Sequence, residues 1–457
     1  MRASIVGFFG YSYPEAIMKE RVDSAVNALK SKGADINFCG YVTDHDEGSQ
    51  IAAKEKLDKS AFDSDCLIVL IVSWLESTPI IKVFSDQLHM PILMWVSAGY
   101  RTEAGFISPA SAAGGTGLSF ALKVFGAKHV SLYDIVDNGM RTDEALDFIK
   151  FSAALKGLRN IRVAAIGYAD MNLFPFMYDG TLIKKYTGIH VDNLDFYDLN
   201  GYMEKVSDLQ IKDFIKDFKS RFELVIEPTE ADLNILAKSY IGINSLIDEK
   251  NYKAISLKCV LGISKWLNTS PCMLESLIAD KVDTICECDV YGMINQVIIK
   301  ELTGTRAVYL EFYEFYKNSI LLSACGFAPF SLCVGDRMKV QGRSWGSSGG
   351  IMNVSELKGG NITFSKIYTV NGQMHMHCYR ATAKSPEKWQ EDGWDGKGPK
   401  MPSLEVSIEG DLEELQEYAA GQHYIISYGD YYKLLEKYCR FSRIRFNEHK
   451  DIDFGYR

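Results

Sequence analysis

Residues 285–313 read ICECDVYGMINQVIIKELTGTRAVYLEFY and contain two apolar runs, one ending at Glu287 and the other at Glu311, with a helical pattern between them. Asp289 is a suitable N-cap for that helix, and Gly304 is a suitable residue to end it. The expected elements are a strand over Val282–Glu287, a helix to about Leu302 and a strand over Arg306–Glu311. This order predicts a β-α-β unit.

The lengths of these elements predict where the two glutamates lie. A helix of ~14 residues rises ~21 Å, and a strand of six residues covers ~20 Å, so the chain returns level with its starting edge. With the usual right-handed crossover, Glu287 and Glu311 both reach the carboxyl edge of one parallel sheet. Open α/β sheets bind their ligands at that edge.

Two carboxylates at one edge repel each other, so either one of them holds a proton or a cation lies between them. Magnesium and manganese are hard cations that take oxygen ligands. A structural alternative stays open, in which one of the pair Glu287 and Glu311 faces a helix in a salt bridge and the other merely ends a strand.

The rest of the chain alternates strands and helices before it becomes rich in strands and glycine turns. We expect an α/β protein with two stacked parallel-sheet, Rossmann-like domains followed by a β-rich, barrel-like C-terminal domain. The strand Phe222–Ile226 is assigned to the second α/β series, and Asn371-Gly372 predicts a hairpin. His375 and His377 are expected on a solvated strand face outside the site. The expected domains cover residues 1–158, 159–330 with the two acids, and 331–457.

Composition excludes several classes of protein. The 457 residues are 47% hydrophobic and 24% charged, which is typical of a folded protein, and the net charge of -9 provides no basic surface for nucleic acid. No apolar run approaches the roughly 20 residues of a membrane span, and no secretion signal is recognisable. The ten cysteines form no CxxC pair. We therefore expect reduced thiols in a cytoplasmic protein that binds neither nucleic acid nor membrane.

Three short motifs together resemble the L-fucose/L-arabinose isomerase family. In that family a strand ends in E-x-D, the next helix ends in L-T-G, a second acid ends the following strand, and a C-terminal stretch reads H-[HY]-x-x-x-x-G-D. The matching residues here are Glu287-Cys288-Asp289, Leu302-Thr303-Gly304, Glu311, and His423, Tyr424, Gly429 and Asp430. The resemblance extends over the succession of two α/β regions and a β-rich region.

The resemblance implies an aldose-ketose isomerase that passes a proton between C1 and C2 through an ene-diol. It implies Glu287, Glu311 and His423 as ligands of Mn²⁺, or alternatively of Mg²⁺ or Co²⁺, with the two glutamates also acting as the acid/base pair. Such a cation would hold the substrate's O1 and O2 and stabilise the negative charge that develops on them.

Departures from the family pattern leave the sugar open. The fucose isomerases usually have Asp where Glu311 stands, whereas the arabinose isomerases have Glu there. The second histidine ligand of the arabinose branch is absent, because the comparable stretch offers Ser323, Ala324 and Cys325. This favours a three-ligand, fucose-type site. The substrate candidates are an L-fucose-like aldose, a D-arabinose-like aldose and a 6-substituted hexose such as sulfoquinovose.

The resemblance also implies substrate contacts and an oligomer. Candidate contacts are Lys258, Ser323, Trp74 and Gln422. A solvent-facing lysine and an ordinary domain-interface tryptophan are the structural alternatives for Lys258 and Trp74. A homo-oligomer, trimeric or hexameric, with its pocket at the subunit interface is expected.

Two other functions are considered. A catalytically inactive sugar-binding or regulatory relative would explain the missing histidine near Ala324. A dinucleotide-dependent enzyme is disfavoured, because the glycines of AAGGTGLSF do not form the required fingerprint.

Overall fold

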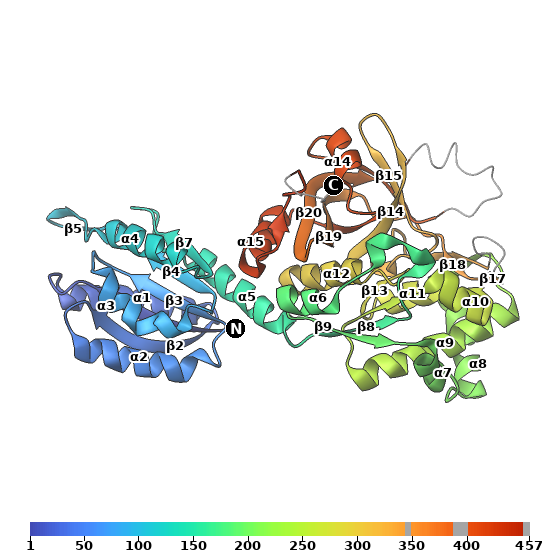
Figure 1. The fold of residues 1–457 in the computed structure, drawn as a ribbon, viewed down its shortest axis with the longest axis horizontal. Helices are drawn as coiled ribbons and strands as arrows, with labels where there is room; N and C mark the ends of the chain where they lie inside the picture. Colours follow the sequence, from blue (N-terminus) through green and yellow to red (C-terminus); the bar gives the residue numbers. More distant parts are fainter. Residues whose placement is uncertain (343–348, 387–400, 451–457) are drawn as a thin grey trace. The chain divides into compact units, whose positions relative to one another are not determined.

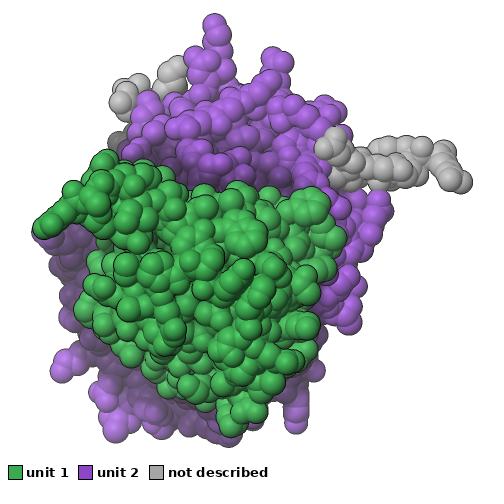
Figure 2. Space-filling view, turned by 90° about the vertical axis from the view of Figure 1, so that its left-hand side faces the viewer, with its two compact units in different colours: residues 1–157 green, residues 158–457 purple. Residues whose placement is uncertain are grey.

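The computed structural model describes residues 1–342, 349–386 and 401–450 (Figure 1). The chain divides into two compact units, Met1–Gly157 and Leu158–Arg457, which Figure 2 shows in different colours. Among the described residues, no helix combines the length and the apolar character needed to cross a membrane.

The first unit is built on a five-stranded parallel sheet in the order β2-β1-β3-β4-β7 (Figure 1). Its strands are β1 (Arg2–Phe9), β2 (Asp35–Thr43), β3 (Cys66–Ile71), β4 (Ile92–Val96) and β7 (His129–Tyr133). Its main helices are α1 (Glu15–Ser31), α2 (Glu47–Ala61), α3 (Ser77–Phe84), α4 (Ser111–Val124) and α5 (Thr142–Leu158). Strand β3 is buried along its whole length, as expected for a strand covered on both faces. The parallel α/β character expected of this region is confirmed.

The second unit begins with a four-stranded parallel sheet in the order β13-β11-β8-β9. The strands are β8 (Arg162–Ile166), β9 (His190–Leu194), β11 (Ala254–Leu257) and β13 (Asp283–Ile285). Helices of this region are α6 (Gly180–Thr187), α7 (Phe196–Met203), α8 (Asp208–Arg221), α9 (Glu230–Lys250), α11 (Cys272–Ala279) and α12 (Val290–Thr303). The apolar side chains of α9 and α11 pack with the inward-facing residues of β8 and β11 in one core.

A closed antiparallel barrel of six strands forms the C-terminal part of the same unit. Its order is β19-β22-β14-β15-β21-β20, and β20 closes the ring by pairing with β19. The strands are β14 (Ala307–Phe315), β15 (Ile320–Ser323), β19 (Gly360–Val370), β20 (Gln373–Lys384), β21 (Ser403–Ile408) and β22 (His423–Tyr428). The parallel sheets and the barrel agree with the expected fold class, while the division into three domains stays a prediction.

The expected β-α-β unit around Glu287 and Glu311 is wrong in its second strand. Strand β13 belongs to the parallel sheet, but β14 pairs antiparallel with β22 and β15 in the barrel. The two glutamates therefore do not lie at the carboxyl edge of one sheet. The chain leaves the sheet through α12 and enters the barrel.

Helix α12 explains this change of partner. All of its residues from Val290 to Ile299 are buried, and the helix contacts β11 and β13 as well as β14, β19 and β22. A helix that is covered all round lies inside the protein rather than on one face of a sheet. Because the parallel sheet and the barrel both pack on α12, the end of β13 lies close to the barrel.

Other expectations have mixed outcomes. The hairpin at Asn371-Gly372 is confirmed, because these residues connect β19 to β20 and both have positive φ, 51° and 73°. Strand β10 (Glu223–Ile226) lies outside the parallel sheet and pairs with β16 (Lys339–Gln341), which also pairs with β18 (Met352–Asn353). His375 and His377 do not lie on a solvated face, since both are buried.

Candidate functional site

The chain turns sharply at Glu287, directly after β13. Glu287 and Cys288 both have a left-handed backbone, with φ of 60° and 55°. Two neighbouring bonds hold the turn, because the Asp170 N–H donates to the Glu287 carbonyl at 3.1 Å and the Cys288 N–H donates to the Leu257 carbonyl at 2.9 Å. Non-glycine residues with such a backbone store strain and cluster at functional sites.

Asp289 then starts α12, as the sequence predicts. Its side chain accepts a bond from the Gly292 N–H at 2.9 Å. The same carboxylate accepts a bond from the Tyr309 hydroxyl at 3.0 Å and forms a buried ion pair with Lys366 of β19. Asp289 therefore joins the helix to two barrel strands.

Glu311 and His423 face the turn from the barrel. They are direct partners in the antiparallel pair of β14 and β22. His423 Nδ1 lies 3.8 Å from Glu287 Oε2, and His423 Nε2 lies 3.9 Å from Glu311 Oε2. The structure thus brings together all three predicted metal ligands, with each carboxylate nearest to a different nitrogen of the imidazole.

Two aromatic rings fix the imidazole of His423. The Tyr309 ring stacks on it with 4.4 Å between centroids and an angle of 1°, and the Phe176 ring lies at 5.7 Å. His423 and Glu287 are both 4% exposed, whereas the Glu311 side chain is 33% exposed. Glu311 is therefore the member of the set that solvent or a ligand reaches most easily.

Burial acts on all three ionisable groups against their charged forms. Together with the neighbouring Glu311 carboxylate, burial raises the pKa of Glu287 to about 8. Burial also raises the pKa of Glu311. It lowers the pKa of His423 well below its usual value, and the Lys366 ammonium adds to that effect. The Lys366 ammonium opposes the rise at Glu287 without cancelling it, and the histidine is held neutral.

The donor set fits a divalent cation chemically. Glu287 Oε2 and His423 Nδ1 are buried without any hydrogen-bond partner, although buried polar atoms are normally bonded. Two carboxylates and a neutral imidazole are suitable ligands for manganese or magnesium. As the side chains stand, no group of three His, Cys, Asp or Glu residues in the described part of the chain is arranged to hold a metal ion. The three residues are a donor set rather than a formed coordination sphere.

The barrel places two further candidates beside this set. Ser323 pairs with Glu311 across β14 and β15, but its hydroxyl is bonded to the Ser403 hydroxyl at 2.8 Å. Gln422 directly precedes His423, and its carbonyl accepts a bond from the Phe312 N–H at 2.9 Å.

The other two candidates lie further away in the chain. Lys258 directly follows β11 and is half-buried. Trp74 belongs to the first unit and is 44% exposed. The structure therefore brings Ser323 and Gln422 next to the donor set, and it places Lys258 at the sheet edge where Glu287 also lies.

Sequence reasoning missed several residues that build the site. Asp170 follows β8 at the same sheet edge, and its carboxylate accepts bonds from the Val260 and Leu261 N–H groups at 2.5 and 2.9 Å. An acid shortly after a predicted strand was a signal by which the sequence could have pointed to Asp170. Tyr309 is two residues from Glu311 on one strand and shares its face. No local signal pointed to Lys366.

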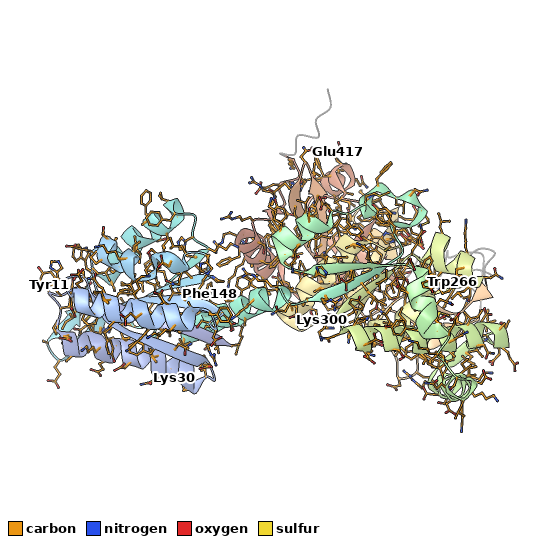
Figure 3. The ribbon with its side chains drawn as sticks, turned by 60° about the horizontal axis from the view of Figure 1, so that its bottom comes forward. Tyr11, Lys30, Phe148, Trp266, Lys300 and Glu417 are labelled. Carbon is orange, nitrogen blue, oxygen red and sulfur yellow. The ribbon has the colours of Figure 1, made fainter. Side chains whose placement is uncertain are left out.

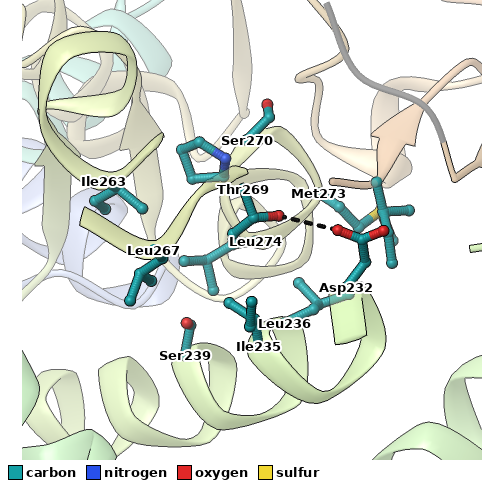
Figure 4. A pocket seen from close by; sticks show the side chains of 12 residues that line it. Asp232, Ile235, Leu236, Ser239, Ile263, Leu267, Thr269, Ser270, Met273 and Leu274 are labelled. Carbon is teal, nitrogen blue, oxygen red and sulfur yellow. Dashed lines mark hydrogen bonds between the residues drawn. The ribbon is translucent and has the colours of Figure 1, made fainter. Parts of the chain in front are cut away.

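A cavity elsewhere in the second unit is too small to be the site. It lies between α9 and the start of α11, and Asp232, Ser239 and Thr269 are among its lining residues (Figure 4). Its volume of about 10 Å³ is the space of one water molecule. The buried Ser239 hydroxyl has no protein partner there, so an internal water fits this cavity.

Two acids, one buried and one partly exposed, lie beside a neutral imidazole where a parallel sheet meets a closed barrel. This arrangement is suited to proton transfer on a small polar substrate. No protein-family model matches the chain. Sequence similarity does connect it with sugar isomerases. The sulfoquinovose isomerase of Priestia aryabhattai is 21% identical over 372 residues, which cover 80% of this chain and 81% of that protein.

The same identity and coverage hold for the sulfoquinovose isomerase of Priestia megaterium (strain ATCC 12872 / QMB1551). A sulfoquinovose isomerase of Alkalicoccus urumqiensis is 20% identical over 256 residues, or 55% of this chain and 57% of that protein. These similarities support an enzyme of the aldose-ketose sugar isomerase class.

Proposed function

We propose that this protein is a divalent-cation-dependent aldose-ketose isomerase whose cation is held by Glu287, Glu311 and His423. The observation that carries the proposal is the position of the His423 imidazole, 3.8 Å from Glu287 and 3.9 Å from Glu311. The unpartnered Glu287 Oε2 and His423 Nδ1 support it, because a cation satisfies both atoms at once.

Mn²⁺ is the proposed cation, with Mg²⁺ or Co²⁺ as alternatives. When bound, the cation supplies positive charge against the negative charge that develops on O1 and O2 of the sugar. His423 contributes a neutral nitrogen, and the rings of Tyr309 and Phe176 hold it in place. Burial around Glu287 excludes water from the reacting carbons.

The two glutamates are the proposed acid/base pair. One glutamate removes the proton from C2 of the aldose while O1 takes up a proton from the other glutamate, which gives the ene-diol. O2 then loses its proton as a proton is returned to C1, which gives the ketose. Glu311, whose side chain is 33% exposed, is more accessible to a sugar than Glu287, which is 4% exposed.

The substrate is an aldose of L-fucose-like, D-arabinose-like or 6-substituted hexose type. The names of the three relatives support the last of these, with sulfoquinovose as the example. We further propose a cytoplasmic enzyme, since all ten cysteines are free thiols. A trimer or hexamer with Trp74 near a neighbouring pocket is proposed as well, and its test is the mass in solution by light scattering.

The decisive experiment measures bound metal and sugar conversion together. We expect the purified protein to bind Mn²⁺ and to interconvert an aldose and its ketose, with both properties lost after chelation. Glu287→Gln, Glu311→Gln and His423→Ala should each weaken Mn²⁺ binding at least tenfold, because each removes one ligand. Glu314→Gln is the matched control, since Glu314 is an exposed acid on the same strand as Glu311.

Three outcomes contradict the proposal in different ways. Full activity after chelation excludes the role of the cation. If all four variants bind Mn²⁺ as tightly as the wild type does, Glu287, Glu311 and His423 are not the ligands. Tight sugar binding without any conversion, retained in Glu311→Gln, favours the alternative, a catalytically inactive sugar-binding or regulatory relative.

A further inference from the structure

Asp170 is a fully buried acid at the carboxyl edge of the parallel sheet, shortly after β8. It is 0% exposed, so a sugar cannot contact it. Its carboxylate accepts bonds from three backbone N–H groups, those of Met171, Val260 and Leu261, at 2.8, 2.5 and 2.9 Å. Bonds from N–H groups to an ionised carboxylate are about twice as strong as bonds between neutral groups. Asp170 therefore ties its own loop firmly to the loop that follows β11.

The loop after β11 is itself held in place. It contains the π-helical turn η4 (Cys259–Ile263), and α10 (Ser264–Leu267) follows that turn directly. Helix α10 carries Trp266, which Figure 3 labels, and the Trp266 ring stacks on Phe196 of α7 with 5.6 Å between centroids. Single π-helical turns are rare and frequently lie at functional sites. The N–H groups of η4 that bond to Asp170 therefore belong to an anchored segment.

The loop that starts at Asp170, residues 170–176, contacts two of the proposed ligands. At its first residue, the Asp170 N–H donates to the Glu287 carbonyl at 3.1 Å. At its last residue, the Phe176 ring lies 5.7 Å from the imidazole of His423. Glu287 follows the parallel sheet, whereas His423 belongs to the barrel. One short loop thus connects the two structures that carry these ligands.

Strained backbone gathers where this loop meets the turn at Glu287. Met171 and Asn172, directly after Asp170, have φ of 49° and 57°. Glu287 and Cys288, with φ of 60° and 55°, lie on the other side of the bond from the Asp170 N–H. Non-glycine residues keep such a conformation only where their surroundings hold it. The bond from the Met171 N–H to the Asp170 carboxylate is part of that hold, so loss of the carboxylate should let both turns relax.

We propose that Asp170 is a positioning residue that holds Glu287 and His423 at the separation that one cation needs. It acts through the loop 170–176, which its carboxylate fixes against η4, and it contacts neither the cation nor the sugar. This role rests on the proposed isomerase function, in which both residues bind the same cation. A positioning role predicts losses in metal binding and in kcat, while KM for the sugar stays nearly unchanged.

Asp170→Asn tests this role, because the amide keeps the size of the side chain and turns an NH₂ group toward a backbone N–H. We expect the dissociation constant of Mn²⁺ to rise about tenfold or more, kcat at saturating Mn²⁺ to fall about tenfold, and KM for the sugar to stay within about twofold of wild type. Asp179→Asn is the matched control. Asp179 also lies between β8 and α6, and it accepts bonds from the Thr181 and Leu182 N–H groups at 2.7 and 3.1 Å. The control should bind Mn²⁺ as tightly as the wild type does.

A double-mutant cycle shows whether Asp170 acts through Glu287. When it is added to Glu287→Gln, Asp170→Asn should weaken Mn²⁺ binding much less than it does alone, because the ligand that Asp170 positions is already lost. The same fold loss in both backgrounds would overturn the role of Asp170. If Asp170→Asn does not fold, Asp170→Ser takes its place, since the serine hydroxyl accepts one of the three bonds and places no amide group against a backbone N–H.

Hydrogen exchange of the metal-free protein separates this role from the proposed function. Asp170→Asn should speed exchange in η4 and in the segment 286–290, and it should leave α6 as in wild type. If the wild type binds no Mn²⁺ and converts no sugar while this exchange pattern holds, the isomerase function fails and Asp170 still positions the turn at Glu287. If the wild type binds Mn²⁺ and isomerises a sugar but Asp170→Asn changes neither exchange nor Mn²⁺ binding, the role of Asp170 is overturned and the isomerase function stands.

Discussion

At the scale of single residues, His377 shows how strongly the barrel constrains an ionisable group. Its Nδ1 lies 2.8 Å from the Tyr424 hydroxyl and its Nε2 lies 2.7 Å from the Tyr379 hydroxyl. Burial, with a smaller contribution from the neighbouring His449, lowers the pKa of His377 to about 3 despite the opposing charge of Glu414. The folded barrel therefore keeps this imidazole neutral.

The protein should lose stability in acid because of His377. Above pH 6.5 neither the folded nor the unfolded state protonates this group, so its contribution to stability is fully present. Below pH 6.5 the unfolded state takes up a proton that the folded state refuses until pH falls to about 3. We expect a loss on the order of 3 kcal/mol between pH 7 and pH 4.

Denaturant unfolding at several pH values measures this loss. His377→Gln should show a smaller fall between pH 7 and pH 4 than wild type, although its stability at pH 7 is lower. His45→Gln, at an exposed position, should follow the wild-type curve. If the free energy of unfolding of His377→Gln falls with pH as steeply as that of the wild type, other groups cause the acid sensitivity.

The three proposed ligands were easier to predict from the sequence than the residues around them. Glu287, Glu311 and His423 stand in short motifs, and the structure brings their side chains together. Lys366 and Tyr309 could not be found in this way. Their roles depend on the contact between β19, β14 and α12, which joins residues far apart in the chain.

At the scale of elements, the surroundings of α12 could not be predicted from its sequence. Its polar residues Asn295 and Gln296 are typical of a solvent-facing stripe, but both are buried. Asn295 donates to the Ser365 hydroxyl at 3.0 Å, and Gln296 donates to the Ala307 carbonyl at 3.0 Å. Partners of this kind are visible only in the fold, so an ordinary β-α-β crossover was the simplest prediction from the sequence.

Because α12 is packed on all sides, truncation of its apolar residues should be costly. Ile298 is fully buried, and Ile298→Ala leaves a cavity that neighbours on two sides cannot easily fill. We expect the free energy of unfolding to fall by about 2–5 kcal/mol. Chemical denaturation of this variant beside Glu301→Ala, an exposed position on the same helix, measures the difference. A loss below about 1 kcal/mol would mean that the helix lies at a surface.

At the scale of the whole molecule, all three proposed ligands lie in the second compact unit. A cation that binds the folded protein but not the unfolded chain stabilises by about 2.7 kcal/mol at a concentration a hundred times its dissociation constant. Differential scanning calorimetry should therefore show that Mn²⁺ raises the unfolding temperature of Leu158–Arg457 and leaves the transition of Met1–Gly157 in place.

Two variants test whether the shift in unfolding temperature arises from Mn²⁺ at the proposed ligands. His423→Ala should abolish the shift caused by Mn²⁺, and the control Glu314→Gln should retain it. A shift of both transitions by the same amount would instead show that the two units unfold as one body. No shift in wild type would argue against the cation.

The three proposed ligands are also synthesised at different times. Glu287 follows a strand of the parallel sheet, whereas His423 opens β22, the last strand of the barrel to be synthesised. On the ribosome the two acids emerge well before the histidine. A nascent chain can therefore complete this set only after the barrel closes, so capture of the cation would mark the end of folding rather than guide its beginning.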